Sequence, residues 1–126
     1  MQQLTEYEDI IAEMVRYFER QIVQLQAAGV QDIILDPGFG FAKTIDQNFE
    51  VLQRLADLKV LGLPILAGLS RKSMTYKTLD IPATEALPGT IVLNTIALLH
   101  GAGILRVHDV KEAVQTIKLF KKSITP

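Results

Sequence analysis

Apolar residues in the first part of the chain recur every three or four positions, which is the spacing of one face of an α-helix. This pattern predicts a long helix over residues 6–28. Thr5 and Glu8 have the spacing of a capping box at its start, and Gly29 stands where a left-handed residue ends many helices. The expected buried face consists of Ile10, Ile11, Met14, Val15, Phe18, Ile22 and Leu25.

Three short apolar runs break the helical spacing and predict β-strands. They cover residues 32–35, 64–67 and 104–108. In the first run the apolar residues are continuous, which is typical of a parallel strand covered on both faces. We therefore expect strand–helix units joined by right-handed crossovers.

A helical segment follows each of the first two runs. Residues 45–58 form the first, which begins at a second capping pair, Thr44 and Gln47. The stretch 69–79 is polar and basic, with room for a short helix. The expected apolar stripe of the 45–58 helix is Phe49, Leu52, Leu55 and Ala56.

Two further helices complete the pattern. Residues 83–100 predict a long helix, in which Pro88 either suits the first turn or marks the true beginning. The last helix begins after Asp109, with Glu112 three residues later. Its expected inward face is Val110, Ala113, Val114, Ile117 and Phe120.

One helix followed by three strand–helix units belongs to the α/β class. The pattern leaves two architectures open, a small doubly wound parallel sheet and part of a (β/α)₈ barrel. In both, ligands bind at the carboxyl ends of the strands. The most unusual residues of this chain lie at those ends.

Composition excludes several classes of function. The chain has 126 residues, and 13 Lys and Arg nearly balance 14 Asp and Glu, so no electrostatic surface for nucleic acid or an anionic membrane is expected. A hydrophobic content of 48 % argues against disorder. The absence of Cys excludes disulfides and thiolate metal sites and suits a reducing cytosol. No apolar run reaches the ~20 residues of a membrane span, and we expect no signal peptide.

The first strand end carries the sequence DPGFGFAK at positions 36–43. A carboxylate at the tip of a buried strand needs a partner. Asp36 has the geometry to accept two parallel hydrogen bonds from an aminopyrimidine edge, with Phe39 and Phe41 as a flat apolar wall. The alternative is that Asp36 begins an Asx-type turn and both Phe residues belong to the core.

The second strand end carries the sequence GLSRKS at positions 68–73. Arg71 and Lys72 are adjacent cations flanked by Ser70 and Ser73, which suits an anionic or heteroaromatic ligand. The spacing of a Walker phosphate loop is absent. The alternative is a solvated basic loop.

The third strand end carries the sequence RVHDV at positions 106–110. Arg106 and His108 are two residues apart, so on a strand both point to the same side, where they suit a phosphate or diphosphate. The alternative for His108 is a purely structural role. His100 stands at a helix end beside Gly101, and we expect no catalytic role for it.

These three segments resemble, in order and approximate spacing, the pterin-loop, substrate-loop and last-strand motifs of the dihydropteroate synthase family. Members of that family are inhibited by sulfonamides. They join dihydropterin-6-ylmethyl diphosphate to 4-aminobenzoate in folate biosynthesis and release diphosphate. The resemblance implies a (β/α)₈ barrel, a cytoplasmic homodimer, assistance by Mg²⁺, and small-molecule substrates rather than nucleic acid or membrane.

The resemblance also implies roles for the residues that match the pterin side of the motifs. Asp36 would hold the 2-amino/N3 edge of the pterin, Gly68 would bring backbone close to the ring, and Arg71 would stack over it. Lys72 would hydrogen-bond the pterin ring and, together with Phe41, line the aminobenzoate site.

The remaining matching residues are implied to bind the charged ends of the substrates. Ser73 would meet the aminobenzoate carboxylate, and Arg106 and His108 would hold the leaving diphosphate. The expected catalytic residues are therefore Lys72, Arg106 and His108. No metal ligand is expected among the residues of this chain.

The resemblance extends over nearly the whole chain, yet a complete barrel needs about 250 residues. The family's metal-binding Asn, its two mobile loops and a further pterin-binding Asp and Asn have no counterpart here. We therefore expect residues 1–126 to be a single carboxy-terminal segment with the last three strands of a barrel, inactive by itself. Two alternatives are a non-catalytic βα fragment that self-assembles and a relative of the pterin-dependent methyltransferases, against which residues 70–73 argue.

Overall fold

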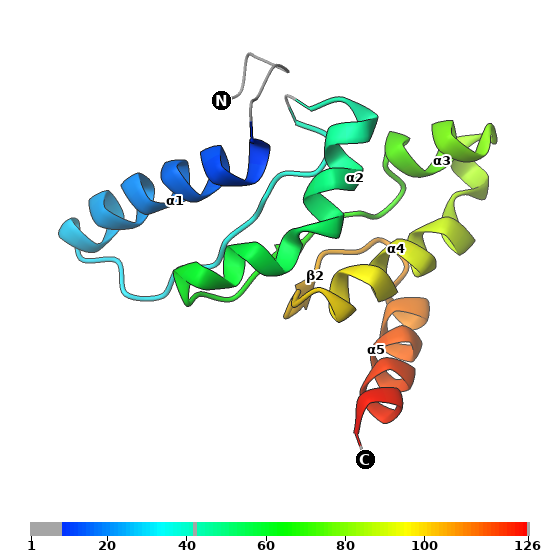
Figure 1. Ribbon diagram of the computed structural model, residues 1–126. Coiled ribbons are helices and arrows are strands. Elements are labelled where there is room, and N and C mark those ends of the chain that lie inside the picture. The colour runs from blue at the N-terminus through cyan, green and yellow to red at the C-terminus, as the bar shows by residue number, and fades with distance from the viewer. Residues whose placement is uncertain (1–8, 42, 126) are drawn as a thin grey trace.

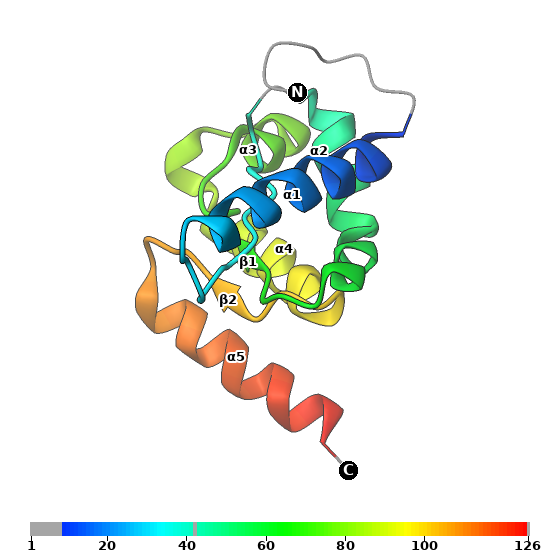
Figure 2. The same ribbon diagram turned by 90° about the vertical axis from the view of Figure 1, so that its left-hand side faces the viewer.

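The computed structural model describes residues 9–41 and 43–125, and helices surround a very short parallel sheet (Figures 1 and 2). The order of elements agrees with the mixed α/β prediction. Two of the helical segments, η1 and η2, are 3₁₀ helices. The elements are α1 (Ile10–Ala27), α2 (Ile45–Gln53), η1 (Leu55–Leu61), β1 (Leu66–Ala67), α3 (Ser73–Leu79), η2 (Ala83–Glu85), α4 (Leu87–Leu99), β2 (Ile104–Leu105) and α5 (Val110–Ile124).

The first helix begins later than the pattern predicts. Asp9 is its N-cap, and one carboxylate oxygen accepts hydrogen bonds from the N–H groups of Ile11 and Ala12, both at 3.1 Å. This carboxylate satisfies two of the N–H groups that the first turn leaves free. The predicted capping box of Thr5 and Glu8 lies outside the described residues.

Two other predicted helix boundaries are confirmed. Gly29 has a φ of 93°, and the N–H of Val30 donates to the carbonyl of Leu25, which closes α1 with a left-handed turn. At the start of α2, Thr44 Oγ1 accepts from the N–H of Gln47 at 3.1 Å while the Gln47 side chain accepts from the N–H of Thr44 at 2.9 Å. Both ends are therefore determined locally by the sequence.

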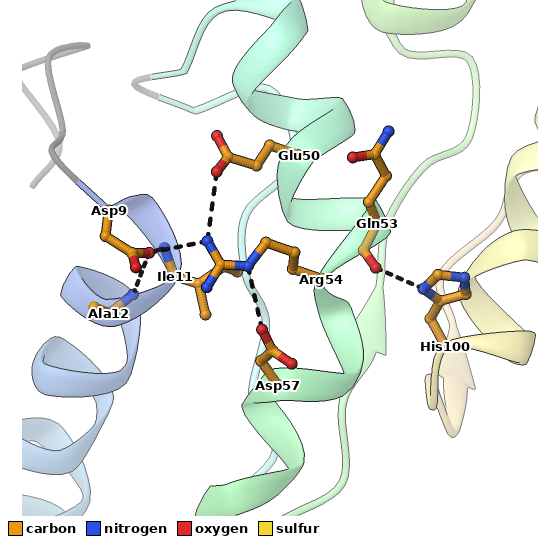
Figure 3. A network of polar contacts seen from close by, with 8 residues as sticks. All are labelled: Asp9, Ile11, Ala12, Glu50, Gln53, Arg54, Asp57 and His100. Carbon is orange, nitrogen blue, oxygen red and sulfur yellow. Dashed lines mark hydrogen bonds and ion pairs between the residues drawn. The ribbon is translucent and has the colours of Figure 1, made fainter.

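Arg54 connects the first two helices, as Figure 3 shows. Its guanidinium donates to Asp9 at 3.1 Å and to Asp57 at 3.2 Å, and Glu50 lies within ion-pair distance. The hydrogen bond from the N–H of Ala12, together with Arg54, holds the pKa of Asp9 below its usual range. Because these groups are solvent-exposed, the pairs are screened by water and contribute little to stability.

The three predicted strand runs lie side by side, but the regular strands are much shorter than predicted. Leu66 and Ala67 of β1 pair in parallel with Ile104 and Leu105 of β2. Of the first run, only Leu35 is bonded, in a parallel bridge to Ile65. Ile34 beside it is 52 % exposed, so this run lacks the cover on both faces that its apolar sequence predicted.

The hydrophobic core lies between the sheet and the helices α1, α2, η1, α3 and α4. In η1 the spacing of three residues places Leu55 and Leu58 on one buried edge, as a 3₁₀ helix requires. Two predicted members of apolar faces, Leu25 and Ala56, are exposed instead. The largest fully buried side chains are Phe39, Ile10, Met14, Leu52, Leu55, Leu58, Ile65, Leu69, Met74 and Val51.

The last helix extends away from the body of the molecule and packs against α4 (Figures 1 and 2). Ala113 is buried as predicted, but Val110 and Val114 are 64 % and 44 % exposed, so their predicted inward position is wrong here. Because α5 packs mainly against α4, it buries a narrow stripe, and the amphipathic pattern of α5 is wider than that stripe. Pro88 lies in the first turn of α4, the long helix that the pattern predicted from residue 83.

His100 makes a hydrogen bond that joins two helices, and its lack of a catalytic role stays a prediction. Its Nδ1 lies 2.8 Å from the carbonyl oxygen of Gln53 (Figure 3). A carbonyl oxygen only accepts, so Nδ1 carries the proton and donates. This bond joins the end of α4 to the end of α2.

Candidate functional site

The turn after the first strand run is organised around the Asp36 carboxylate. One of its oxygens accepts from the N–H of Gly38 at 2.9 Å, which is the Asx-type turn considered above. The other oxygen accepts from the Arg106 guanidinium at 2.8 Å. The carboxylate therefore shapes its own loop and also contacts a residue that follows the third strand. Asp36 therefore forms the Asx-type turn and also makes a polar contact with another strand end.

Lys43 holds the same loop from the inside. Its ammonium group donates to the carbonyl oxygens of Pro37, Gly38 and Phe41 at 2.9, 2.7 and 3.0 Å. Burial lowers the pKa of Lys43 to about 8, and the negative charge of Asp36 opposes this shift. Three carbonyl oxygens around one cation fix the loop that carries Asp36 and Phe41.

Asn48 supports the loop from α2. Its side-chain oxygen accepts from the N–H of Gly40 at 2.8 Å, and its amide donates to the carbonyl of Thr44 at 2.9 Å. Asn48 is buried, and a buried amide with both ends bonded is geometrically restricted. The helix cap and the loop are thus connected through one side chain.

The two Phe residues of the loop have different environments. Phe39 is 1 % exposed and belongs to the core, as the structural alternative proposed. Phe41 is 69 % exposed, and the ammonium nitrogen of Lys72 lies 5.7 Å from its ring centroid. Phe41 is therefore the one of the pair that is available to a ligand, next to a cation from the second strand end.

The loop after β1 is held in an unusual conformation. Arg71 has a φ of 56°, which is uncommon for a residue with a side chain. Its N–H donates to Thr90 Oγ1 at 3.1 Å, and its guanidinium donates to the two oxygens of Asp109 at 2.8 and 3.3 Å. The bond from Arg71 holds the pKa of Asp109 below its usual range. Lys72 and Ser73 follow at the start of α3.

The segment after β2 brings Arg106 and His108 to the same place. β2 ends at Leu105, so neither residue is on the regular strand that the pattern predicted. Ser70 Oγ lies 2.8 Å from Nδ1 of His108 and 3.3 Å from its backbone nitrogen. The Arg106 side chain passes against Gly68, where a Cβ would lie 2.8 Å from its Cζ. Gly68 is therefore needed for the close approach of Arg106.

These segments enclose a hollow of about 410 Å³. The predicted site residues Gly68, Arg71, Lys72, Arg106 and His108 line it. Ser70 and Val107 complete its lining. Asp36 is joined to this hollow through Arg106, and Phe41 lies beside it through Lys72. Ser73 does not line the hollow and is the first residue of α3.

The charges around the hollow favour a ligand that is partly anionic and partly planar. Arg71, Lys72 and Arg106 supply three cations, of which Arg71 and Arg106 are paired with Asp109 and Asp36. A guanidinium has five N–H groups, so each arginine keeps donors for a phosphate or a heteroaromatic ring. The exposed Phe41 ring adds an apolar surface.

Comparison with known proteins shows to which family the chain belongs. The sequence pattern of the family described as pterin binding enzyme matches residues 1–108. The chain belongs to the pterin-binding enzyme family. Among its curated relatives, the dihydropteroate synthase of Escherichia coli K12 is 41 % identical over 127 residues, covering 99 % of this chain and 45 % of that protein. That of Synechocystis is 47 % identical over 122 residues, covering 94 % of this chain and 42 % of that protein.

Solved structures of pterin-binding enzymes have the same arrangement of elements. The dihydropteroate synthase of Clostridium difficile, determined in the presence of pteroic acid, aligns with a TM-score of 0.94 and 39 % identity over 99 % of this chain and 49 % of its own. The enzyme of Xanthomonas albilineans with 4-aminobenzoic acid aligns at 0.91 and 33 % identity, covering 96 % and 46 %. The chain spans about half the length of the relatives it matches.

Two further observations concern membrane-spanning helices and clusters of metal-binding side chains. None of the helices in the described residues is long and apolar enough to cross a membrane. Within residues 9–41 and 43–125, no three His, Cys, Asp or Glu side chains come together as a metal site.

The sequence pattern did not reveal the residues that support this candidate site. Ser70 was considered only as part of a hydroxyl-rich loop, although it contacts His108. Lys43 and Asn48 lie within or beside the motif, but their partners are backbone groups, which leave no pattern in the sequence. Asp109 precedes the last helix, as the pattern predicts, but its carboxylate makes no cap hydrogen bond and binds Arg71 instead.

Proposed function

We propose that this chain is the carboxy-terminal part of a dihydropteroate synthase and that the hollow after β1 and β2 binds its substrates. One observation carries the proposal: residues of three motifs, more than 30 positions apart along the chain, converge on one place. The relatives reported above are all named dihydropteroate synthases. This favours the synthase over a pterin-dependent methyltransferase.

The proposed architecture is the last three strands of a (β/α)₈ barrel. Three parallel runs in the order 35, 65 and 104 support it, as does the placement of polar residues at their carboxyl ends. The exposure of Ile34 agrees with a strand that has further neighbours in the complete barrel. The missing strands would also supply the magnesium site, so no step below is derived through that ion.

The hydrogen-bond capacity of Asp36 and Arg106 fits the proposed roles. A carboxylate has about four acceptor positions, and Asp36 uses two of them within the chain. It can therefore also accept from the 2-amino/N3 edge of a pterin. Arg106 uses one N–H on Asp36 and keeps the others for the diphosphate.

The chemistry requires stabilisation of a leaving group more than a strong base. Breaking the carbon–oxygen bond of the diphosphate ester places negative charge on the diphosphate, which Arg106 and His108 would bind. The dihydropterin cation is delocalised, and Lys72, Phe41 and Ser73 would position the weak aniline nucleophile of 4-aminobenzoate. The aniline nitrogen then loses its proton to water.

A chimera tests the proposal. In the E. coli dihydropteroate synthase, the portion that matches this chain is replaced by residues 1–126, and dihydropteroate formation is measured with both substrates and Mg²⁺. We expect turnover by the chimera and none by the 126-residue chain alone. A folded chimera that binds neither substrate would refute the proposal.

The remaining expectations concern assembly and location. We propose that the chain self-associates, because Val92, Leu99, Leu119 and Ile124 leave large apolar surfaces exposed on α4 and α5. This agrees with the homodimer that the resemblance implies. Its cytoplasmic location stays a prediction from the composition and the resemblance.

A further inference from the structure

Ser70 and His108 form a contact that the proposed roles do not use. Ser70 lies in the loop after β1 and is buried, whereas His108 follows β2 and is exposed at the hollow. Ser70 Oγ lies 2.8 Å from the ring nitrogen Nδ1 and 3.3 Å from the backbone nitrogen of His108. One hydroxyl therefore contacts His108 at two points, across 38 positions of sequence.

Accounting for hydrogens determines the direction of one bond and favours one direction for the other. The backbone N–H of His108 can only donate, so Ser70 Oγ is the acceptor there. The hydroxyl has one hydrogen of its own. Among the described residues, Nδ1 of His108 is its one acceptor within hydrogen-bond distance. The hydroxyl hydrogen is satisfied within the chain when it donates to Nδ1, and this arrangement requires a neutral ring with Nδ1 unprotonated.

The other ring nitrogen then carries the proton. In neutral imidazole one nitrogen is a donor and the other an acceptor. With Nδ1 accepting from Ser70, Nε2 is the donor, and no group in the described part of the chain occupies it. The neighbouring Asp109 does not compete, because its carboxylate is bound by Arg71.

We propose that Ser70 is a positioning residue, which fixes His108 in the tautomer with its proton on Nε2 and so presents a hydrogen-bond donor to the hollow. A donor is what an anionic leaving group requires, whereas the opposite tautomer would present a lone pair to it. The consequence for diphosphate rests on the proposed function. The tautomer itself does not.

His100 serves as an internal reference for measuring the tautomer of His108. His100 donates from Nδ1 to the carbonyl of Gln53, so it has the opposite tautomer. The chain has two His residues, and a His100→Asn variant assigns their signals. Long-range ¹H–¹⁵N correlation spectra of the ¹⁵N-histidine-labelled chain distinguish protonated from unprotonated ring nitrogens, at alkaline pH where the spectra no longer change.

The expected spectrum shows unprotonated Nδ1 in His108 and protonated Nδ1 in His100. In Ser70→Ala the His108 signals are expected to move toward exchange between both tautomers, and in Ser70→Thr, which keeps the hydroxyl, they are expected to stay. Protonated Nδ1 in His108 of the unmodified chain overturns the inference without any variant. Unchanged His108 signals in a folded Ser70→Ala also overturn it.

The functional consequence is measured in the chimera with inorganic diphosphate as the probe. Loss of one oriented hydrogen bond predicts about 2- to 10-fold weaker binding in Ser70→Ala, restored in Ser70→Thr, with 4-aminobenzoate binding unchanged. If the tautomer is as expected and the chimera does not bind diphosphate at all, the proposed function fails and the inference about Ser70 stands. If diphosphate binds to the Ser70→Ala chimera as tightly as to the Ser70→Thr chimera, the positioning role is refuted.

Discussion

Gly68→Ala tests whether the close approach between Gly68 and Arg106 matters for ligand binding. The added Cβ would lie 2.8 Å from Cζ and 3.1 Å from Nε of Arg106 and would overlap its terminal nitrogen. Ordinary contacts need about 3.5 Å or more, so the guanidinium must retreat by roughly 1 Å. The guanidinium is the end of a flexible, half-exposed side chain and can move at little cost, so we expect its 2.8 Å bond to Asp36 to be displaced rather than the fold to be disrupted.

The two expected consequences of this substitution differ in magnitude. The Arg106 and Asp36 side chains are 53 % and 37 % exposed, so loss of the pair lowers the free energy of unfolding by at most about 1 kcal/mol. A misplaced charged donor costs about 1.5–3 kcal/mol in binding an anion, which is roughly a 10- to 150-fold weaker affinity. We therefore expect a nearly normal fold with a large loss of diphosphate affinity.

The assay combines urea unfolding of the chain with equilibrium binding to the chimera. Inorganic diphosphate and pteroic acid serve as separate probes of the two ends of the site. Gly103→Ala is the matched control, because a Cβ there would meet nothing within 4 Å. If Gly68→Ala weakens pteroic acid and leaves diphosphate binding unchanged, Gly68 acts through the pterin, and the reasoning about Arg106 is refuted.

The remaining predictions concern the fold, the loop and assembly. Thr44→Ala removes half of a complete capping box, so urea unfolding is expected to show a loss of about 1 kcal/mol. Thr125→Ala at the end of α5 loses one exposed hydrogen bond to the carbonyl of Lys121 and is expected to change the stability less. Burial lowers the pKa of Lys43 to about 8 from an ordinary 10.5. Between those two pKa values the unfolded chain binds more protons than the folded chain. The free energy of unfolding of the chain, compared with that of Lys43→Met, is therefore expected to rise with pH. A stability difference between the two proteins that does not depend on pH contradicts the burial of this ammonium group. Sedimentation is expected to show an average mass that rises with concentration and falls in Leu119→Lys, and a monomer at every concentration contradicts self-association.

Local chemistry made the helix boundaries predictable. Gly29 and the Thr44–Gln47 pair act within a few residues of themselves, so the sequence alone determines where α1 ends and α2 begins. The parallel order of the three strand runs was also predictable, because strand–helix units allow few arrangements. Once the runs are parallel, the residues after them share one edge, which explains why Arg71, Lys72, Arg106 and His108 meet.

Features that depend on neighbours were not predictable from periodicity. Val110 and Val114 belong to an amphipathic stripe, but only the packing of α5 determines how much of that stripe is covered. The length of the first strand depends on whether a neighbour bonds to it, and among the described residues Leu35 is the bonded position. The contact of Ser70 with His108 follows from the register of β1 against β2, which the sequence does not encode locally.

Arg106 provides the most direct test of the central claim that the hollow binds the diphosphate end of the substrate. The measurement is the pair of KM values, for the pterin diphosphate ester and for 4-aminobenzoate, in the chimera with Arg106→Ala. The exposed Arg20→Ala on α1 is the control. The account predicts a KM for the ester raised at least about 10-fold, from the loss of a charged hydrogen bond, with little change for 4-aminobenzoate. Equal changes in both values, or none, would contradict it.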